Sequence, residues 1–478
     1  MSARASPGAV MPNRYHRVLV VVAVGALAMA TSACRADRAR SGESSSAAVG
    51  SSLVALRGVR VVDGSGGPPI ENATVVLEGE RVREVGPNVT VPKGARVVDL
   101  GGTTMVPGLV SDHSHLGMVD GTRASVANET RANILRQLRQ YEAYGVTTVT
   151  SLGLNGPVFY ELQPDLHRGA LPGADVFGAD RGIGVPSGAP PVEAGTENLY
   201  RVETPEQAVA AVRDSATRHP DLVKIWVDDF HGSLHQKMSP EIQRAVIDEA
   251  HRLGLRVAAH VYYLDDARRL VQEGVDILAH GVRDRAVDDA FVKLLRDKKT
   301  WYIPTLGLDE SFYLFAEAPP FTREMWVRHA LQPALAAQFD DPAWRASVLA
   351  DAKKLKADKD SVANNLANVK KLYDGGVAIG FGTDSGATPL RIPGFAELHE
   401  VALMVKAGLP PVQAIRIATS RAAELLGHPD RGMLAPGKLA DFVIVEGDPT
   451  KDVDDLTRIV EVWHRGRKVS GALSSFQP

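Results

Sequence analysis

The chain has 478 residues, of which 44% are hydrophobic and 23% are charged, and its formal net charge is −3. This composition is typical of a globular protein, and the small net charge gives no indication of a surface for nucleic acid or anionic membranes. The single cysteine excludes both an intrachain disulfide framework and a cysteine-rich metal site.

The first 33 residues have the pattern of a secretory signal. Arg14 and Arg17 precede a short apolar run at 18–30, and small residues follow immediately before Cys34. A basic start, a short apolar core and small residues before a cleavage site are typical of export signals, and the run is too short for a comfortable membrane span. We therefore expect residues 1–33 to be removed and the mature protein to be exported.

The position of Cys34 also predicts how the mature protein is held. A lone cysteine directly after small residues resembles a bacterial lipobox, in which Cys34 would become a lipid-modified N-terminus. Thr31 departs from that pattern, because a larger aliphatic residue is usual there, and simple cleavage with release is the alternative. Residues 34–52 are rich in serine, alanine and glycine, which predicts a flexible tether. The expected location is the periplasm or the outer membrane of a bacterium.

Strand-like segments occur near both ends of the chain. Short β-branched runs lie at 59–62, 73–77 and 96–98, and comparable runs return at 440–445 and 459–463. Glycine and proline clusters separate the runs of the first group, which favours a small antiparallel unit. We expect residues 53–104 and 426–478 to join into one small β-sandwich.

The region between them, 105–425, alternates strand and helix signals, which favours parallel βα units. The candidate strands lie at 105–110, 146–150, 174–178, 222–227, 256–260, 277–280, 301–305 and 378–383. Eight units over roughly three hundred residues fit a barrel. A doubly wound sheet is the alternative, but no phosphate-binding glycine fingerprint opens any unit. The predicted fold class is α/β: a (β/α)8 TIM barrel with a small β-sandwich domain formed from both ends of the chain.

Two segments are longer than a minimal barrel needs. Residues 181–200 follow the third candidate strand and are rich in glycine and proline. Loops at the C-terminal ends of barrel strands carry function, so we expect this loop to gate the substrate. Residues 308–375 follow the seventh strand and are typical of extra helices, which we expect to pack on the barrel and line part of the pocket.

A histidine pair follows the first strand of the predicted barrel. His113 and His115 are separated by one serine and come directly after the apolar run at 105–110. Alternate residues of an extended strand point the same way, so both imidazoles can face one point. Two imidazoles offered from one strand end are suited to binding a metal ion.

Lys224 lies inside the otherwise apolar strand at 222–227. A buried lysine is costly unless it is neutral or paired. A deprotonated amine can take up carbon dioxide as a carbamate, which is a bridging carboxylate suited to two cations. The alternative is an ordinary salt bridge to Asp228, Asp229 or another carboxylate.

His260, His280 and Asp384 end three further strand-like runs. His260 and His280 come from consecutive strands, so they should be neighbours at the C-terminal end of the barrel, where active sites of this fold gather. Each residue also has a structural alternative: a lone histidine is more often a core residue, and Asp384 could be a helix N-cap. Together with the histidine pair and Lys224 they predict a metal site.

These motifs resemble the amidohydrolase superfamily of the binuclear metal type. The resemblance rests on Pro107-Gly108-Leu109-Val110 before the histidine pair, Lys224-Ile225-Trp226, Ala258-Ala259-His260, Ala279-His280-Gly281, Gly382-Thr383-Asp384 and the tail at 434–443. Residues 238–260 are similar to the imidazolonepropionase-like and Xaa-Pro dipeptidase-like branch. Asp112 is a departure, because the family more often has an aspartate two residues before its first histidine.

The resemblance implies two divalent metal ions, and zinc fits a ligand set of nitrogen and oxygen. It assigns His113, His115 and Asp384 to the more buried ion, His260 and His280 to the more exposed ion, and carboxylated Lys224 to the bridge between them. A hydroxide shared by the ions would be the nucleophile. Asp384 would take its proton and pass it to the leaving amine.

The resemblance also narrows the reaction. Related deaminases usually carry a glutamate three residues after the strand-five histidine, whereas Tyr263 stands there in this chain and Lys224 is present. Hydrolysis of a small-molecule amide is therefore expected, with N-acyl amino acids, dipeptides and related amides as candidate substrates. Tyr262 matches a tyrosine that can contact the substrate in this branch, and a packed aromatic side chain is the alternative.

Two other functions stay open. The same pair of ions would activate water against a lactone, a carbamate or an ester, so a hydrolase of those bonds is the first alternative. A non-catalytic lipoprotein that uses the barrel for binding is the second, and the presence of all six metal-site residues weighs against it. The sequence leaves the oligomeric state open, a homo-oligomer included.

Overall fold

The computed structural model describes residues 53–473. The expected signal at 1–33, the tether at 34–52 and Cys34 lie outside the described residues. Within residues 53–473, no helix combines the length and apolar character needed to span a membrane.

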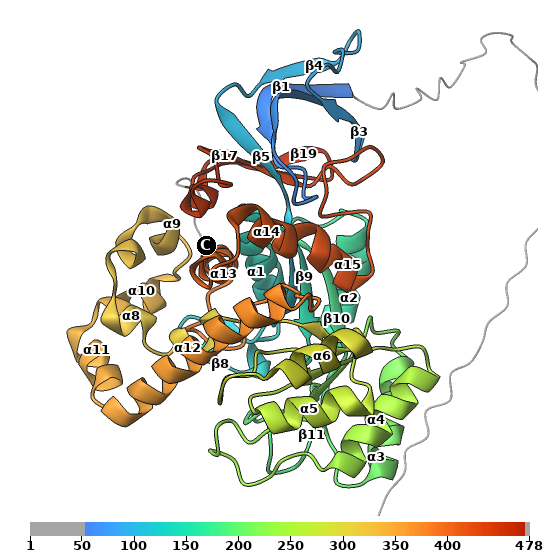
Figure 1. Ribbon diagram of the computed structural model, residues 1–478, viewed down its shortest axis with the longest axis vertical. Coiled ribbons are helices and arrows are strands. Elements are labelled where there is room, and N and C mark those ends of the chain that lie inside the picture. The colour runs from blue at the N-terminus through green and yellow to red at the C-terminus, as the bar shows by residue number, and fades with distance from the viewer. Residues whose placement is uncertain (1–52, 474–478) are drawn as a thin grey trace, which may run out of the picture. The chain divides into compact units, whose positions relative to one another are not determined.

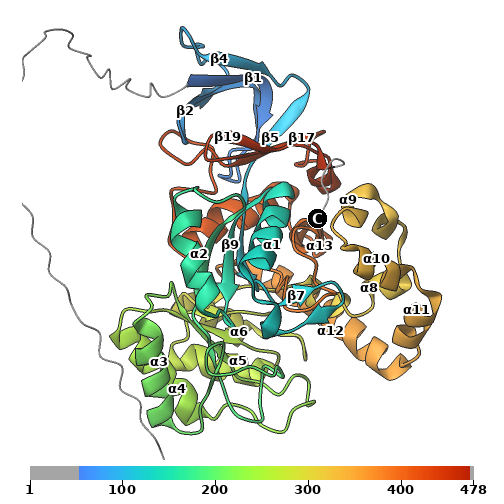
Figure 2. The same ribbon diagram turned by 180° about the vertical axis from the view of Figure 1, so that it is seen from behind.

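Strands from the two ends of the chain pair in one sheet, drawn in blue and red in Figures 1 and 2. Within the described residues, its eight strands are β1 (Leu53–Val61), β2 (Ile70–Glu78), β3 (Arg81–Gly86), β4 (Arg96–Asp99), β5 (Thr103–Pro107), β17 (Phe442–Glu446), β18 (Ile459–His464) and β19 (Arg467–Ser470). The antiparallel pair of β5 and β17 joins the two ends, with Pro107 opposite Phe442. Leu56, Val75 and Trp463 belong to an apolar core that these strands form for themselves.

Parallel strands form the barrel beside this sheet. They are β6 (Leu109–Ser114), β9 (Val146–Leu152), β10 (Asp175–Ala179), β13 (Val223–Trp226), β14 (Val257–His260), β15 (Ile277–Leu278) and β16 (Trp301–Tyr302). Bridges between Ala179 and Leu222, between Tyr302 and Ile379, and between Ser114 and Ser385 close the ring through the segment 378–385. The strands are buried almost throughout, as in parallel sheets covered on both faces. The predicted α/β barrel with an additional domain is confirmed.

The first and last barrel strands differ from their predicted bounds. The predicted run 105–110 contains the end of β5 and the start of β6, so it crosses from the terminal sheet into the barrel. Gly108 separates β5 from β6, and a Cβ atom there would lie 2.3 Å from Oγ1 of Thr147. The segment 378–385 takes the place of the eighth barrel strand. Isolated backbone hydrogen bonds hold it to β6, such as the 2.7 Å bond from Asp112 N to Phe381 O.

Amphipathic helices cover the barrel. They are α1 (Arg131–Ala143), α2 (Pro157–His167), α3 (Pro205–Ala216), α4 (Pro240–Arg252), α5 (Leu264–Glu273), α6 (Asp289–Lys298), α13 (Phe395–Lys406), α14 (Pro411–Arg416) and α15 (Ala422–Leu426). α4 begins where the Ser239 hydroxyl accepts a hydrogen bond from Ile242 N and proline occupies the first turn. Ile242, Val246 and Ala250 recur every four residues on its buried face.

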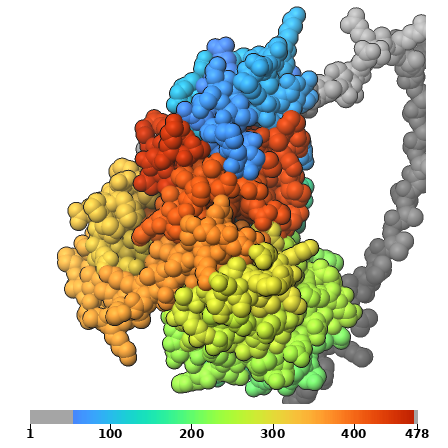
Figure 3. All heavy atoms as spheres, in the orientation of Figure 1, coloured from blue at the N-terminus to red at the C-terminus, as the bar shows by residue number. Residues whose placement is uncertain are grey.

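The segment after β16 is a helical insertion. It contains α7 (Gly307–Glu310), α8 (Leu314–Glu317), α9 (Met325–Arg328), α10 (Pro333–Asp340), α11 (Pro342–Leu349) and α12 (Ala352–Asp374). Figure 3 shows its yellow and orange surface standing beside the barrel. The Asn364 and Asn368 side chains on α12 donate to the carbonyls of Arg283 and Val282, each at 3.0 Å. The insertion therefore supports the loop that follows β15.

The loop at 181–200 is tied to the barrel edge. Its short strand β11 (Ile183–Gly184) pairs with both β12 (Tyr200–Arg201) and β13. The guanidinium of Arg201 donates to the carbonyls of Val185, Gly188 and Pro190. These contacts hold the base of the loop, and its expected gating role stays a prediction.

Candidate metal centre

β6 and the eighth barrel segment bring His113, His115 and Asp384 together. The Nε2 atoms of His113 and His115 lie 3.2 and 3.1 Å from Oδ1 of Asp384. The backbone N–H of Asp384 donates to His113 O at 2.9 Å. Asp384 has a φ of 60°, a left-handed conformation that aspartate adopts more readily than most residues and that often occurs at functional sites.

Two glycines permit this close approach. A Cβ atom at Gly382 would lie 2.6 Å from the Cβ atom of His113. A Cβ atom at Gly386 would lie 2.0 Å from the carbonyl oxygen of His115. Larger residues at either position would force the histidine strand away from Asp384.

Lys224 is fully buried beside the histidines. Its Nζ lies 3.5 Å from Nε2 of His113. Among the described residues it forms no ion pair, because Asp228 faces His260 and Asp229 accepts a hydrogen bond from Tyr263. The salt-bridge alternative for Lys224 is therefore wrong for this structure. Burial lowers the pKa of Lys224 to about 7, against the opposing effect of the Asp384 and Asp228 charges, so the neutral amine is accessible.

His280 and His260 approach from the ends of β15 and β14. The ring centroid of His280 lies 4.5 Å from that of His113 and 4.3 Å from that of His260. Nδ1 of His280 contacts Oγ1 of Thr305 at 2.9 Å. Nε2 of His260 lies 3.2 Å from Oδ2 of Asp228, and among the described residues no hydrogen bond engages its Nδ1. His280 is thus held through Nδ1, and the carboxylate of Asp228 adjoins Nε2 of His260.

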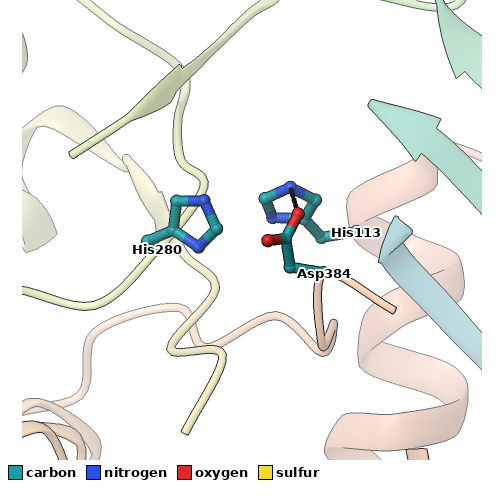
Figure 4. Close-up of side chains that lie close together, drawn as sticks. All are labelled: His113, His280 and Asp384. Carbon is teal, nitrogen blue, oxygen red and sulfur yellow. Dashed lines mark ion pairs between the residues drawn. The ribbon is translucent and has the colours of Figure 1, made fainter. Parts of the chain in front are cut away.

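Within the described residues, one group of side chains has the spacing of a metal site. Ligand atoms of His113, His280 and Asp384 all lie within 4.8 Å of one another, and all three residues are buried. Figure 4 shows these side chains pointing toward a common space. His115 adjoins the group through Asp384 and His260 adjoins it through His280, so the structure brings the predicted ligands to one end of the barrel.

The electrostatics of the group suit a cation. Burial lowers the pKa of His113 to about 3 and also lowers the pKa values of His260 and His280, so these imidazoles are neutral at pH 7. Burial alone would raise the pKa of Asp384, but the Arg391 charge and the two histidines outweigh it and hold the pKa well below its usual range. Neutral imidazoles and an ionised carboxylate are the forms that bind metals. A buried metal-binding group of histidine and aspartate is therefore present.

Sequence reasoning missed two residues that hold Asp384. Arg391 donates from Nη1 to Oδ2 of Asp384. Glu397, buried on α13, accepts hydrogen bonds from the hydroxyls of Thr383 at 2.6 Å and Ser385 at 2.7 Å. A single arginine in a loop and a single glutamate on a helix have no periodic or motif signal, so only the tertiary contacts identify them.

Tyr262 follows His260 by two residues and is partly buried. Its hydroxyl is 3.0 Å from Oγ of Ser361 on α12. Its ring stacks on His231 with centroids 3.8 Å apart. Tyr262 therefore joins the barrel end to the insertion, and its contact with a substrate stays a prediction.

A sequence profile of the amidohydrolase family matches residues 104–469. The chain belongs to the amidohydrolase family. This amidohydrolase is 28% identical over 269 residues to an uncharacterized protein of Mycobacterium tuberculosis, a match that covers 56% of this chain and 62% of that protein. The chain therefore spans less than two thirds of that relative.

Two further comparisons cover more of this amidohydrolase. It is 24% identical over 402 residues to the imidazolonepropionase of Deinococcus radiodurans, covering 80% of this chain and 88% of that enzyme. The solved structure of a Xaa-Pro dipeptidase with bound methionine in its active site is similar in fold, with a TM-score of 0.70 and 22% identity over 88% of this chain and 100% of the other. The family is one of hydrolases that act on carbon–nitrogen bonds.

We expect Asp228→Asn to weaken metal binding by this amidohydrolase. Asp228 lies 3.2 Å from Nε2 of His260, and removing such a partner of a metal ligand typically costs about 10- to 100-fold in affinity. A zinc competition titration measures the change. Asp229→Asn is the matched control, because Asp229 contacts Tyr263 instead. Equal zinc affinities for the two variants would contradict the role of Asp228.

Proposed function

We propose that this protein is a binuclear metal-dependent amidohydrolase that cleaves an amide or peptide-type carbon–nitrogen bond of a small substrate. The candidate substrates are N-acyl amino acids, dipeptides and related amides. The observation that carries the proposal is the convergence of His113, His280 and Asp384 within 4.8 Å beside the buried Lys224, whose Nζ lies 3.5 Å from Nε2 of His113. That combination offers nitrogen ligands, an ionised carboxylate and an amine that carbon dioxide can modify.

The donor set fits two divalent cations. His113, His115 and Asp384 would hold the more buried ion, and His260 and His280 the more exposed one. Lys224, carboxylated, would bridge them. In the described structure, the buried Nδ1 of His113 has no hydrogen-bond partner, and Nε2 of His260 lies 3.2 Å from Asp228 without hydrogen-bond geometry. Zinc is the expected ion, since it accepts both imidazole and carboxylate ligands.

The cations, when bound, lower the pKa of water and polarise the scissile carbonyl. Asp384 is ionised at neutral pH, so its carboxylate accepts the proton of the attacking water and returns it to the leaving nitrogen. Arg391 and the Glu397 network fix the direction of that carboxylate. Tyr262, two residues after His260, would contact the substrate.

The names of similar proteins support a reaction at a carbon–nitrogen bond. One relative is an imidazolonepropionase, and one protein of similar fold is a Xaa-Pro dipeptidase. The absence of a glutamate three residues after His260, where Tyr263 stands, favours amide hydrolysis over deamination.

Matched amide and ester substrates test this assignment. The zinc-loaded protein should hydrolyse N-acyl amino acids or dipeptides, measured by release of the free amine. The corresponding esters and lactones, measured by release of acid, separate the alternative reaction. Turnover of esters or lactones without turnover of any amide would replace the proposed function with that of an ester or lactone hydrolase.

We also propose that the enzyme is exported and anchored to the bacterial outer membrane through lipid on Cys34. The basic start, the apolar run at 18–30 and the small residues before Cys34 support this location. Cys34→Ala should abolish incorporation of labelled palmitate and move the protein to the soluble fraction, while its hydrolytic activity stays the same. Unchanged membrane partitioning in that variant would exclude an anchor at Cys34.

A further inference from the structure

A buried arginine lies three residues beyond His280, in the loop after β15. Arg283 is 2% exposed, and its Nη1 donates to Gly281 O at 2.9 Å. Its Nε lies 3.0 Å from Oδ2 of Asp309, but the angle is unsuitable for a hydrogen bond, and both oxygens of Asp309 also lack one. A guanidinium carries five N–H donors. Among the described residues, only one acceptor uses them, so this cation retains donors for a ligand.

The surroundings of Arg283 belong to the candidate metal centre. Its Cζ lies 5.2 Å from the ring centroid of Tyr262, which stacks on His231. Burial lowers the pKa of His231 to about 4, and the charge of Arg283 contributes to that shift. Burial is the main cause of the lowered pKa of His260, and the charge of Lys224 and then that of Arg283 lower it further. The guanidinium is therefore close to the side of the site where the more exposed ion is expected.

The backbone around Arg283 is held in place. Its N–H donates to Tyr262 O at 3.0 Å, and its carbonyl accepts from Asn364 of α12 at 3.0 Å. Tyr262 is linked to α12 as well, through Ser361. A donor group on a fixed backbone loses little entropy when a ligand binds.

We propose that Arg283 binds a carboxylate of the substrate, so that this amidohydrolase selects N-acyl amino acids or dipeptides with a free carboxylate over neutral amides. This inference rests on the proposed function. A guanidinium fork matches a carboxylate in geometry and can serve two carboxylates along different edges, which allows Asp309 to stay in place. Arg391 is a less suitable receptor, because its Nη1 donates a hydrogen bond to Asp384, whereas the ion pair between Arg283 and Asp309 contains no hydrogen bond.

Binding of acid and amide pairs tests the proposal without requiring turnover. Several N-acyl amino acids and their carboxamides are titrated into the zinc-loaded full-length protein by calorimetry. At least one acid should bind about ten- to a hundredfold more tightly than its carboxamide, as expected for a charge-assisted hydrogen bond. Arg283→Met and Arg283→Gln should reduce that ratio to about one, and Arg283→Lys should keep part of it.

Arg431→Met is the matched control. Arg431 is also buried in an ion pair, 2.8 Å from Asp175, but it lies away from the metal group and should leave the ratio unchanged. A merely structural Arg283 would lower stability in its variants without changing the ratio. Three outcomes would overturn the proposal. The wild-type protein could bind acids and carboxamides with a ratio near one, or the ratio could stay unchanged in both neutral Arg283 variants. The third is a ratio that is lost in Arg391→Met alone.

Kinetics separate this inference from the proposed function. For acids that are hydrolysed, Arg283→Gln should raise KM much more than it lowers kcat. If the protein binds acids selectively through Arg283 but hydrolyses no amide, the carboxylate site stands and the proposed amide hydrolysis is wrong. If acids and carboxamides are hydrolysed with equal kcat/KM, the proposed amide hydrolysis stands and the proposed carboxylate site at Arg283 is wrong.

Discussion

Asp384→Asn should fold like the parent protein but lose turnover by about a hundredfold or more, the contribution typical of a general acid–base group. The amide has the same shape as the carboxylate, so the 3.2 and 3.1 Å contacts with His113 and His115 can persist. The substitution removes the negative charge that binds a cation and accepts a proton. The measurement is kcat on the best substrate, together with zinc content and the thermal midpoint.

Asp441→Asn is the control for Asp384→Asn. Asp441 is a buried carboxylate next to β17, where it accepts a hydrogen bond from Arg465 N at 2.7 Å. It is not part of the metal group, so its variant should retain turnover even if stability falls. Equal kcat for Asp384→Asn and the parent would remove Asp384 from the mechanism.

Lys224→Ala should lose both zinc and activity, because the proposed bridge between two ions would be missing. The alanine leaves space where the lysine side chain and its carbamate would lie. Short carboxylic acids such as acetate or propionate should therefore enter and restore part of the activity. Zinc content and turnover, each with and without added acid, measure the effect.

Lys224→Met controls for the loss of packing. Methionine fills most of the same buried volume without a nitrogen, so this variant should stay folded, remain inactive and resist rescue. Full activity of either variant without added acid would refute a bridging role for Lys224. Rescue of Lys224→Met to the same extent as Lys224→Ala would show that the added acid acts elsewhere.

The fold could be predicted from the sequence because its strands are short apolar runs alternating with amphipathic helices. The bounds of the first strand could not, because Met105 and Val110 lie in one continuous apolar run that serves two different sheets. Periodicity identifies such a run as extended but gives no sign of the sheet to which each half belongs. The change occurs at Gly108, where the neighbouring Thr147 leaves no room for a side chain.

Some residues of the candidate site could be predicted from the sequence and others could not. His113 and His115 could be placed together because strand alternation is a local rule. Asp228, Arg283 and Arg391 could not be placed, because each acts through a partner at least seven residues away in the sequence. Their charges are unremarkable in a loop and become significant only when the barrel closes around the metal group.

The metal content of the purified protein tests the central claim most directly. After zinc and bicarbonate are supplied and excess metal is removed, elemental analysis should find about two equivalents of zinc per chain, as a binuclear hydrolytic site requires. One equivalent would contradict the bridging role of Lys224 and favour a mononuclear enzyme. No bound metal would contradict the proposed hydrolytic mechanism and favour a binding protein built on the same barrel.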